Sequence, residues 1–162
     1  MKKTLILLLL LTSNILKSQY CSSATSTTNI TPTASTQTTT SFNSGRPCFV
    51  FNATVGCTYL FSTCGLSTID TYLSLYTGTI SVGQTYNDDA CSLQSNISWS
   101  CPTSGVYSLL LTEWSVGGVC NNITGNVQLS YRSICPYSTT LTIPSSGSNT
   151  ISCGTYTKMK SN

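Results

Sequence analysis

Two adjacent aspartates are the residues in this sequence most suggestive of chemistry. The stretch TYNDDACSLQS (85–95) places Asp88 and Asp89 side by side, in a chain that has only four acidic residues. Like charges in contact repel, so the pair calls for a role that offsets the repulsion. A metal site, a catalytic pair and a hydrogen-bonded turn are the three roles to consider.

Calcium is one role that suits these oxygen atoms. It takes about six to eight oxygen ligands from carboxylates, amides and carbonyls. Asn87, Asp88 and Asp89 supply several from one loop, and Asp70 opens a neighbouring strand-like run. However, Asn and Asp side chains also accept hydrogen bonds from nearby backbone N–H groups and so shape turns. We therefore expect a tight turn between strands here, with a calcium site at Asp70, Asn87, Asp88 and Asp89 as the alternative.

Catalysis fits the sequence least well. The chain has no histidine, which excludes Ser–His and Cys–His nucleophiles. A glycosidase needs two carboxylates that face a sugar cleft, and neighbouring residues in one strand or turn are poorly placed for that. Asp70 with Glu113 stays open as a pair, although a small sandwich seldom forms such a cleft. The sequence predicts no enzymatic activity.

Aromatic residues form a third candidate site. If Leu73 and Leu75 point into a core, Tyr72 and Tyr76 point outward from the same strand. Trp114 follows the apolar run 107–111 and falls on the opposite face or in the next loop. Exposed rings of this kind stack against sugars, because a pyranose has apolar faces and polar edges. The alternative is that these rings only cover a sandwich surface.

The start of the chain predicts export. Lys2 and Lys3 precede the apolar run 4–12, which is too short to span a bilayer, so residues 1–18 are read as a signal peptide. Lys2, Lys3 and Lys17 leave with it, and four cations then face four anions. A nearly neutral chain lacks the basic patch that nucleic acids require. The mature chain also has no later membrane span, and we expect it outside the cell or on its surface.

All nine cysteines follow the signal peptide. Export favours disulfides, whereas zinc is disfavoured because the chain has no C-x-x-C pair and no histidine. Cys153 is the expected unpaired cysteine, and Cys64–Cys91 is the expected bridge. Eight cysteines are candidates for four bridges: Cys21, Cys48, Cys57, Cys64, Cys91, Cys101, Cys120 and Cys135.

Short alternating runs predict the elements that position these residues. They are rich in aromatic and β-branched residues, and most are separated by Gly, Asn, Asp, Ser or Pro. They cover 48–54, 57–63, 70–77, 95–101, 106–114 and 126–132. We predict an all-β fold, an antiparallel two-sheet jelly-roll-like sandwich stapled by disulfides, over 46–134. Residues 19–45 form a Ser/Thr-rich linker or edge strand, and 135–162 are the truncated start of a second β module.

Four motifs, in order, resemble those of pre-peptidase C-terminal-like modules of secreted bacterial proteins, in the cysteine-containing form common in Bacteroidetes. They are G-x-x-Y-x-F at 56–61, D-x-Y-L-x-L-Y at 70–76, NDD at 87–89 and S-G-x-Y at 104–107. The resemblance covers about residues 46–132 and implies a jelly-roll-like sandwich with Asp70, Asp88 and Asp89 near one end. Some members bind calcium and some bind polymers. The tail resembles the opening of a CUB-like module.

The expected function is that of a secreted, non-catalytic accessory module for binding or adhesion. Its expected partner is extracellular polysaccharide or other cell-surface material. The alternative is a structural spacer without a ligand, a truncated fragment of a larger multidomain exoprotein.

Overall fold

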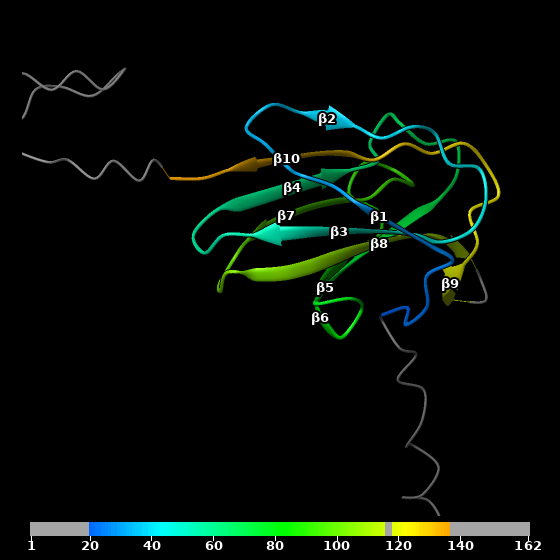
Figure 1. Cartoon of the computed structure of the whole chain (residues 1–162). Coiled ribbons are helices and arrows are strands. Elements are labelled where there is room, and N and C mark those ends of the chain that lie inside the picture. Colours follow the sequence, from blue (N-terminus) through cyan, green and yellow to red (C-terminus); the bar gives the residue numbers. More distant parts are fainter. Residues whose placement is uncertain (1–19, 116–117, 137–162) are drawn as a thin grey trace, which may run out of the picture.

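A computed structural model describes residues 20–115 and 118–136 of the 162-residue chain. The regular secondary structure in these ranges consists of β-strands alone, and the strands form two sheets that pack face to face (Figure 1). The all-β two-sheet sandwich is therefore confirmed. The predicted signal peptide at 1–18, most of the predicted CUB-like tail and Cys153 lie outside the described residues. Within those residues, no helix is long and apolar enough to cross a membrane.

The larger sheet has six strands and contains most of the candidate site. Its order is β1 (Ser26–Asn29), β3 (Pro47–Ala53), β8 (Gly105–Ser115), β5 (Thr71–Thr77) and β6 (Val82–Asn87), and β9 (Gly118–Asn121) also pairs with β8. The smaller sheet has the order β2 (Gln37–Thr38), β10 (Ser130–Ile134), β4 (Thr58–Ser62) and β7 (Asn96–Ser100).

One pair of strands departs from the antiparallel expectation. β1 runs parallel to β3, whereas the other described pairs are antiparallel. A parallel pair needs a connection that crosses over. The chain between β1 and β3 supplies it by forming β2 on the other sheet before it returns.

The core lies between the sheets and follows the alternation seen in the sequence. Leu73 and Leu75 point inward from β5, and Tyr107, Leu109 and Leu111 point inward from β8. From the second sheet and the chain before β10 come Tyr59, Phe61, Ile97, Val127 and Leu129, with Trp99 and Tyr131 partly buried against them. Because side chains alternate across a strand, the opposite faces of β5 and β8 need another cover.

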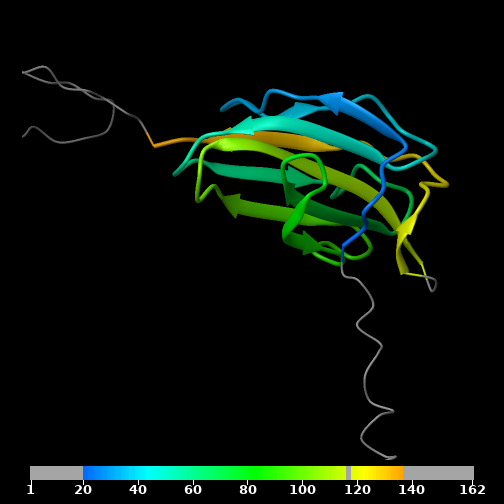
Figure 2. The same cartoon turned by 60° about the horizontal axis from the view of Figure 1, so that its bottom comes forward.

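The N-terminal segment (residues 20–25) supplies that cover. It crosses the outer face of the six-stranded sheet beside β6 (Figure 2). Cys21 is fully buried there with Cys48, Tyr76 and Leu110, and the Tyr76 hydroxyl donates to the Cys21 carbonyl. Further along, β1 and β2 are edge strands and Ile30 joins the core. Residues 20–45 thus pack as part of the sandwich.

Three disulfides staple the described chain: Cys21–Cys120, Cys57–Cys135 and Cys64–Cys91. The expected Cys64–Cys91 bridge is confirmed. The expectation of four bridges is wrong, because Cys48 and Cys101 are free and buried. Cys48 packs in the outer cluster beneath the N-terminal segment, whereas Cys101 packs in the core between the sheets. The six-stranded sheet lies between the two clusters. The Cys48 and Cys101 thiols therefore cannot form a disulfide with each other in this fold.

Candidate functional site

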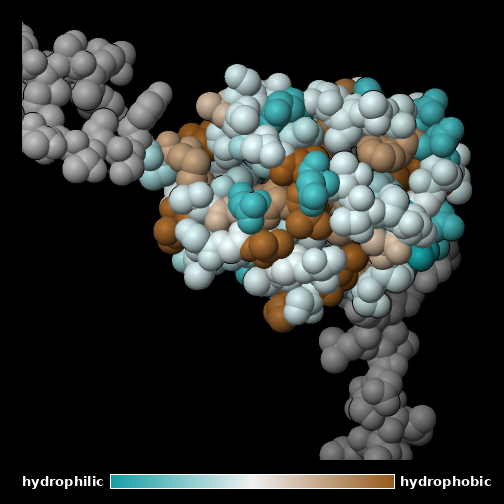
Figure 3. Space-filling view, viewed as in Figure 1, coloured by the Kyte–Doolittle hydropathy of each residue, from teal (hydrophilic) through white to brown (hydrophobic). Residues whose placement is uncertain are grey.

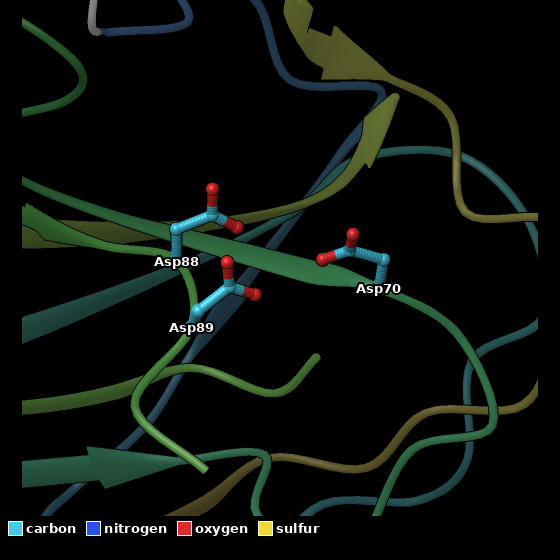
Figure 4. A group of neighbouring side chains, drawn as sticks. All are labelled: Asp70, Asp88 and Asp89. Carbon is cyan, nitrogen blue, oxygen red and sulfur yellow. The ribbon is translucent and has the colours of Figure 1, made fainter. Parts of the chain in front are cut away.

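Three carboxylates meet at one end of the six-stranded sheet. Asp70 directly precedes β5, and Asp88 and Asp89 directly follow β6. Because β5 and β6 are antiparallel, the start of one lies beside the end of the other. One carboxylate oxygen from each residue lies within 4.8 Å of the others, and the side chains point toward one another (Figure 4). We call this group the acidic corner.

Asn87, the fourth expected ligand, has a different task. Its Oδ1 accepts a hydrogen bond of 2.8 Å from the backbone N–H of Asn96, at the start of β7. The amide oxygen is therefore already used in linking the end of β6 to the other sheet. Within the NDD motif the turn-shaping role falls on Asn87, and the two aspartate side chains are left for the acidic corner.

A buried cluster of hydroxyl groups holds the acidic corner in place. The Ser95 Oγ lies within hydrogen-bond distance of three carbonyl oxygens, at 2.6 Å from Thr71, 2.9 Å from Asn87 and 2.8 Å from Asp88. The Ser95 N–H donates to the Thr63 and Thr71 hydroxyls. Ser95, Thr63 and Thr71 are fully buried. They fix the start of β5 against the end of β6, so the backbone on both sides of the corner is rigidly placed.

The sequence analysis did not identify Ser95. It is the first residue of the predicted run 95–101, and nothing else in the sequence distinguishes it from the chain's many other serines. Ser95 is buried where β5, β6 and β7 meet. This burial depends on tertiary structure, and no local sequence pattern predicts it.

A disulfide closes the loop that follows the acidic corner. Cys91 and Gln94 form an isolated bridge in a tight turn, in which Ser92 has a positive φ of 64°. The Ala90 N–H donates to the Gln94 carbonyl, and Cys91 is bonded to Cys64 next to the end of β4. The loop is thereby tied to both sheets, which restricts movement of Asp88 and Asp89.

The electrostatics of the acidic corner disfavour three negative charges. Burial, followed by the neighbouring charges of Asp89 and Asp70, raises the pKa of Asp88 to about 6. Burial, followed by Asp89 and Glu113, also raises the pKa of Asp70. All four acidic residues of the chain thus influence one region. Their mutual repulsion would be relieved by a proton or by a cation.

No side-chain cation offsets this charge within the described ranges. Their two cationic residues are Arg46 and Arg132, and no ion pair joins either to the acidic corner. Arg46 instead donates to the Ser23 carbonyl at 2.9 Å and to Asn122 Oδ1 at 2.9 Å. Moreover, Oδ1 of Asp70 and Oδ1 of Asp88 are inaccessible to solvent and have no hydrogen-bond partner. Buried unpaired carboxylate oxygens are costly, and a bound cation would satisfy them.

The acidic corner fits the requirements of calcium better than those of zinc. Its donors are hard carboxylate oxygens, without the thiolate or imidazole that zinc sites commonly use. Asp70, Asp88 and Asp89 can together provide three to six oxygens, depending on whether each binds through one or both. The two unpartnered oxygens, Oδ1 of Asp70 and Oδ1 of Asp88, are among these donors.

The prediction that Tyr72 and Tyr76 are exposed rings able to stack against a sugar is wrong. Tyr72 and Tyr76 do lie on the face opposite Leu73 and Leu75, but each is only 3% exposed. Tyr72 stacks on Tyr86, and the Tyr20 ring packs edge-on against both Tyr76 and Tyr86. The N-terminal segment covers this face because the Cys21–Cys120 disulfide anchors it. Tyr72 and Tyr76 are therefore not surface rings.

Two other rings are exposed near the acidic corner. Trp114 is 39% exposed, and its backbone N–H donates to the Asp70 carbonyl at 3.1 Å. This bond continues the β5–β8 register by one residue, so Trp114 lies opposite Asp70 on the same face of the sheet. Tyr86, also 39% exposed, lies two residues before Asp88. The face of the molecule in Figure 3 is coloured mostly near the middle of the hydropathy scale, with brown and teal groups among the pale ones.

No protein-family model matches this sequence, and no curated protein is similar to it. Among solved structures, the chain is similar to the pre-peptidase C-terminal domain of a collagenase from Bacillus anthracis. The TM-score is 0.47 at 13% identity, over 67% of this chain and 94% of that one. It is also similar to the periplasmic inhibitor of g-type lysozyme from Aeromonas hydrophila, with a TM-score of 0.49 at 13% identity, over 67% and 98%. At these values neither likeness assigns a family or a function to this chain.

Proposed function

We propose that this chain is a secreted, non-catalytic accessory module that binds calcium at the acidic corner and attaches to extracellular polysaccharide. The three disulfides support residence in an oxidising compartment outside the cytoplasm. The exposed Trp114 and Tyr86 near the corner support a polymeric ligand with apolar faces.

One observation carries the calcium proposal. Asp70 Oδ1 and Asp88 Oδ1 are shielded from solvent without a hydrogen-bond partner, in a group of three carboxylates that no described cation neutralises. The surrounding backbone is rigid, because the Ser95 cluster and the Cys64–Cys91 bridge hold it. A site that is formed before the ion arrives does not lose affinity to ordering of the loop.

Calorimetric titration of the full mature protein with calcium chloride tests this proposal. Thermal melts with calcium and with the chelator EGTA provide a second readout. We expect one bound ion and a higher melting temperature in calcium, because an ion that binds only the folded state stabilises it by mass action. At a calcium concentration of 100 times Kd the stabilisation is about 2.7 kcal/mol.

Asp88→Asn is the variant that removes a ligand charge, and Glu113→Gln is its matched control. The Glu113 carboxylate accepts hydrogen bonds of 2.7 Å from the backbone N–H and the hydroxyl of Thr124, outside the corner. Asp88→Asn should abolish the calcium-dependent shift, whereas Glu113→Gln, which removes a nearby charge but no ligand, should retain most of it. Identical melts of the unaltered protein in calcium and in EGTA would refute calcium binding.

A further inference from the structure

The three carboxylates of the acidic corner provide between three and six oxygens, so they leave coordination positions open wherever a carboxylate binds through a single oxygen. The Asn87 amide oxygen is occupied by Asn96, and the Asp70 carbonyl accepts from the Trp114 N–H. The Asp88 carbonyl is within hydrogen-bond distance of Ser95 Oγ and Ala90 N. The carboxylates therefore carry the coordination, and calcium takes about six to eight oxygens in irregular geometry.

The open side of the corner faces solvent. Asp89 is exposed, whereas Asp70 and Asp88 are partly buried with one oxygen each fully enclosed. Coordination positions on the side of Asp89 are accordingly accessible to oxygens from outside the chain. Water can fill them, and so can a ligand that offers two oxygens at once.

Trp114 restricts what such a ligand can be. It lies directly opposite Asp70 on the same face of the sheet, where opposite residues have Cβ atoms about 5 Å apart. Trp114 is 39% exposed. A ligand that contacts both the ion and Trp114, across Asp70, therefore presents hydroxyl oxygens to the ion and an apolar face to the indole. A sugar ring with two adjacent hydroxyl groups has both properties.

We propose that the acidic corner is a calcium-bridged sugar site, in which vicinal hydroxyls of a polysaccharide complete the calcium coordination while the sugar ring packs on Trp114. This inference rests on the proposed function, because it requires the calcium ion. It adds the class of ligand and the manner of binding. The polymer is bound through the ion, so its retention is lost when the ion is removed.

The test uses the full mature protein on three immobilised polymers: mannan, galactan and mannan whose vicinal diols have been cleaved with periodate. Retention is measured in calcium and in EGTA. We expect retention on at least one intact polymer in calcium, none in EGTA, and none on periodate-treated mannan. Trp114→Ala should weaken sugar retention about tenfold with the calcium Kd unchanged. Val106 is another exposed apolar residue of β8, and Val106→Ala is the matched control. This variant should have unchanged sugar retention and an unchanged calcium Kd.

The possible outcomes distinguish a failure of the proposed calcium binding from a failure of the sugar site. Failure of the calcium titration refutes the proposed function and the sugar site with it. Calcium binding without retention on either intact polymer overturns the sugar site alone. Retention that persists in EGTA, or on periodate-treated mannan at equal strength, overturns the calcium bridge. An unchanged affinity of Trp114→Ala for the polymer overturns the role of the indole.

Discussion

The Ser95 hydroxyl oxygen lies 2.8 Å from the backbone oxygen of Asp88, and this contact joins the start of β7 to the residue at the centre of the acidic corner. The same hydroxyl lies 2.6 Å from the Thr71 carbonyl, one residue after Asp70. A single buried serine thus connects the two segments that provide the carboxylates. The position of the ligands depends on the packing between the sheets as well as on the aspartates themselves.

Ser95→Ala should lower both stability and calcium affinity. The change removes the one hydroxyl proton shared among these buried carbonyl oxygens and leaves the Thr71 hydroxyl with one partner fewer, which costs about 1–3 kcal/mol in the free energy of unfolding. Because Ser95 touches no carboxylate oxygen, the loss of calcium affinity would come from altered ligand positions. Denaturant unfolding and calcium calorimetry measure the two effects. Ser98→Ala, on the exposed face of β7, should change neither.

Loss of the Cys64–Cys91 bridge should affect the acidic corner locally. The bridge closes a separation of 27 residues, and replacing both cysteines by serine should cost about 3.5 kcal/mol. Calcium affinity should fall as well, because Asp88 and Asp89 directly precede the freed loop. The double variant Cys57→Ser with Cys135→Ser opens the bridge beside the end of β10 and provides the comparison. Equal calcium affinities in the two folded variants would contradict a local effect.

Stability without calcium should increase as the pH is lowered from 7 to 5. The pKa of Asp88 is raised from 3.8 to about 6 in the folded protein, so between these values the folded state binds more protons than the unfolded state. The contribution of this group is therefore present at low pH and lost as the pH rises through about 6. Asp70, whose pKa is also raised, acts in the same direction.

Thermal melts in EGTA from pH 5 to pH 7 measure this dependence. Asp88→Asn should flatten it, because an amide does not titrate. Calcium affinity should change in the opposite sense and fall below pH 6, since the proton and the ion compete for the same oxygens. A melting temperature that rises from pH 5 to pH 7 in EGTA would contradict the raised pKa of Asp88.

Gly83→Ala should displace the N-terminal segment. A Cβ at this position would lie 2.5 Å from Cζ of Tyr20, so the Tyr20 ring must move off β6. Overpacking of this kind costs about 1–3 kcal/mol, measured by denaturant unfolding, and the near-ultraviolet circular dichroism of the tyrosines should change. At Gly105 the nearest atom is Cε2 of Tyr107 at 3.9 Å, so Gly105→Ala should be tolerated and serves as the control. Wild-type stability and spectrum in Gly83→Ala would show that Tyr20 does not pack there.

Several features of this protein followed from local patterns. The period of two in YLFST and TYLSLYT predicted strands with Tyr59, Phe61, Leu73 and Leu75 on the inner faces, because one buried face imposes that period. The 82–87 strand was missed, since VGQTYN has little apolar alternation and lies at an edge. β9 was missed for the same reason, whereas β1 and β2 lie within residues 19–45, for which an edge strand was one of the two predictions. They exist because a neighbouring strand offers hydrogen bonds, which the strand's own residues do not reveal.

The sequence by itself determined the alternation of the strands, the absence of histidine and the scarcity of charge, because these are properties of residues and their nearest neighbours. Tertiary structure decided three further matters. It brought Asp70 to Asp88 and Asp89 across the β5–β6 pair, it left Cys48 and Cys101 unbridged, and it buried Tyr72 and Tyr76 under the N-terminal segment. In each case the deciding contact joins residues far apart in the chain. A local pattern fixes which face a side chain takes, but only the packing of distant segments fixes what covers that face.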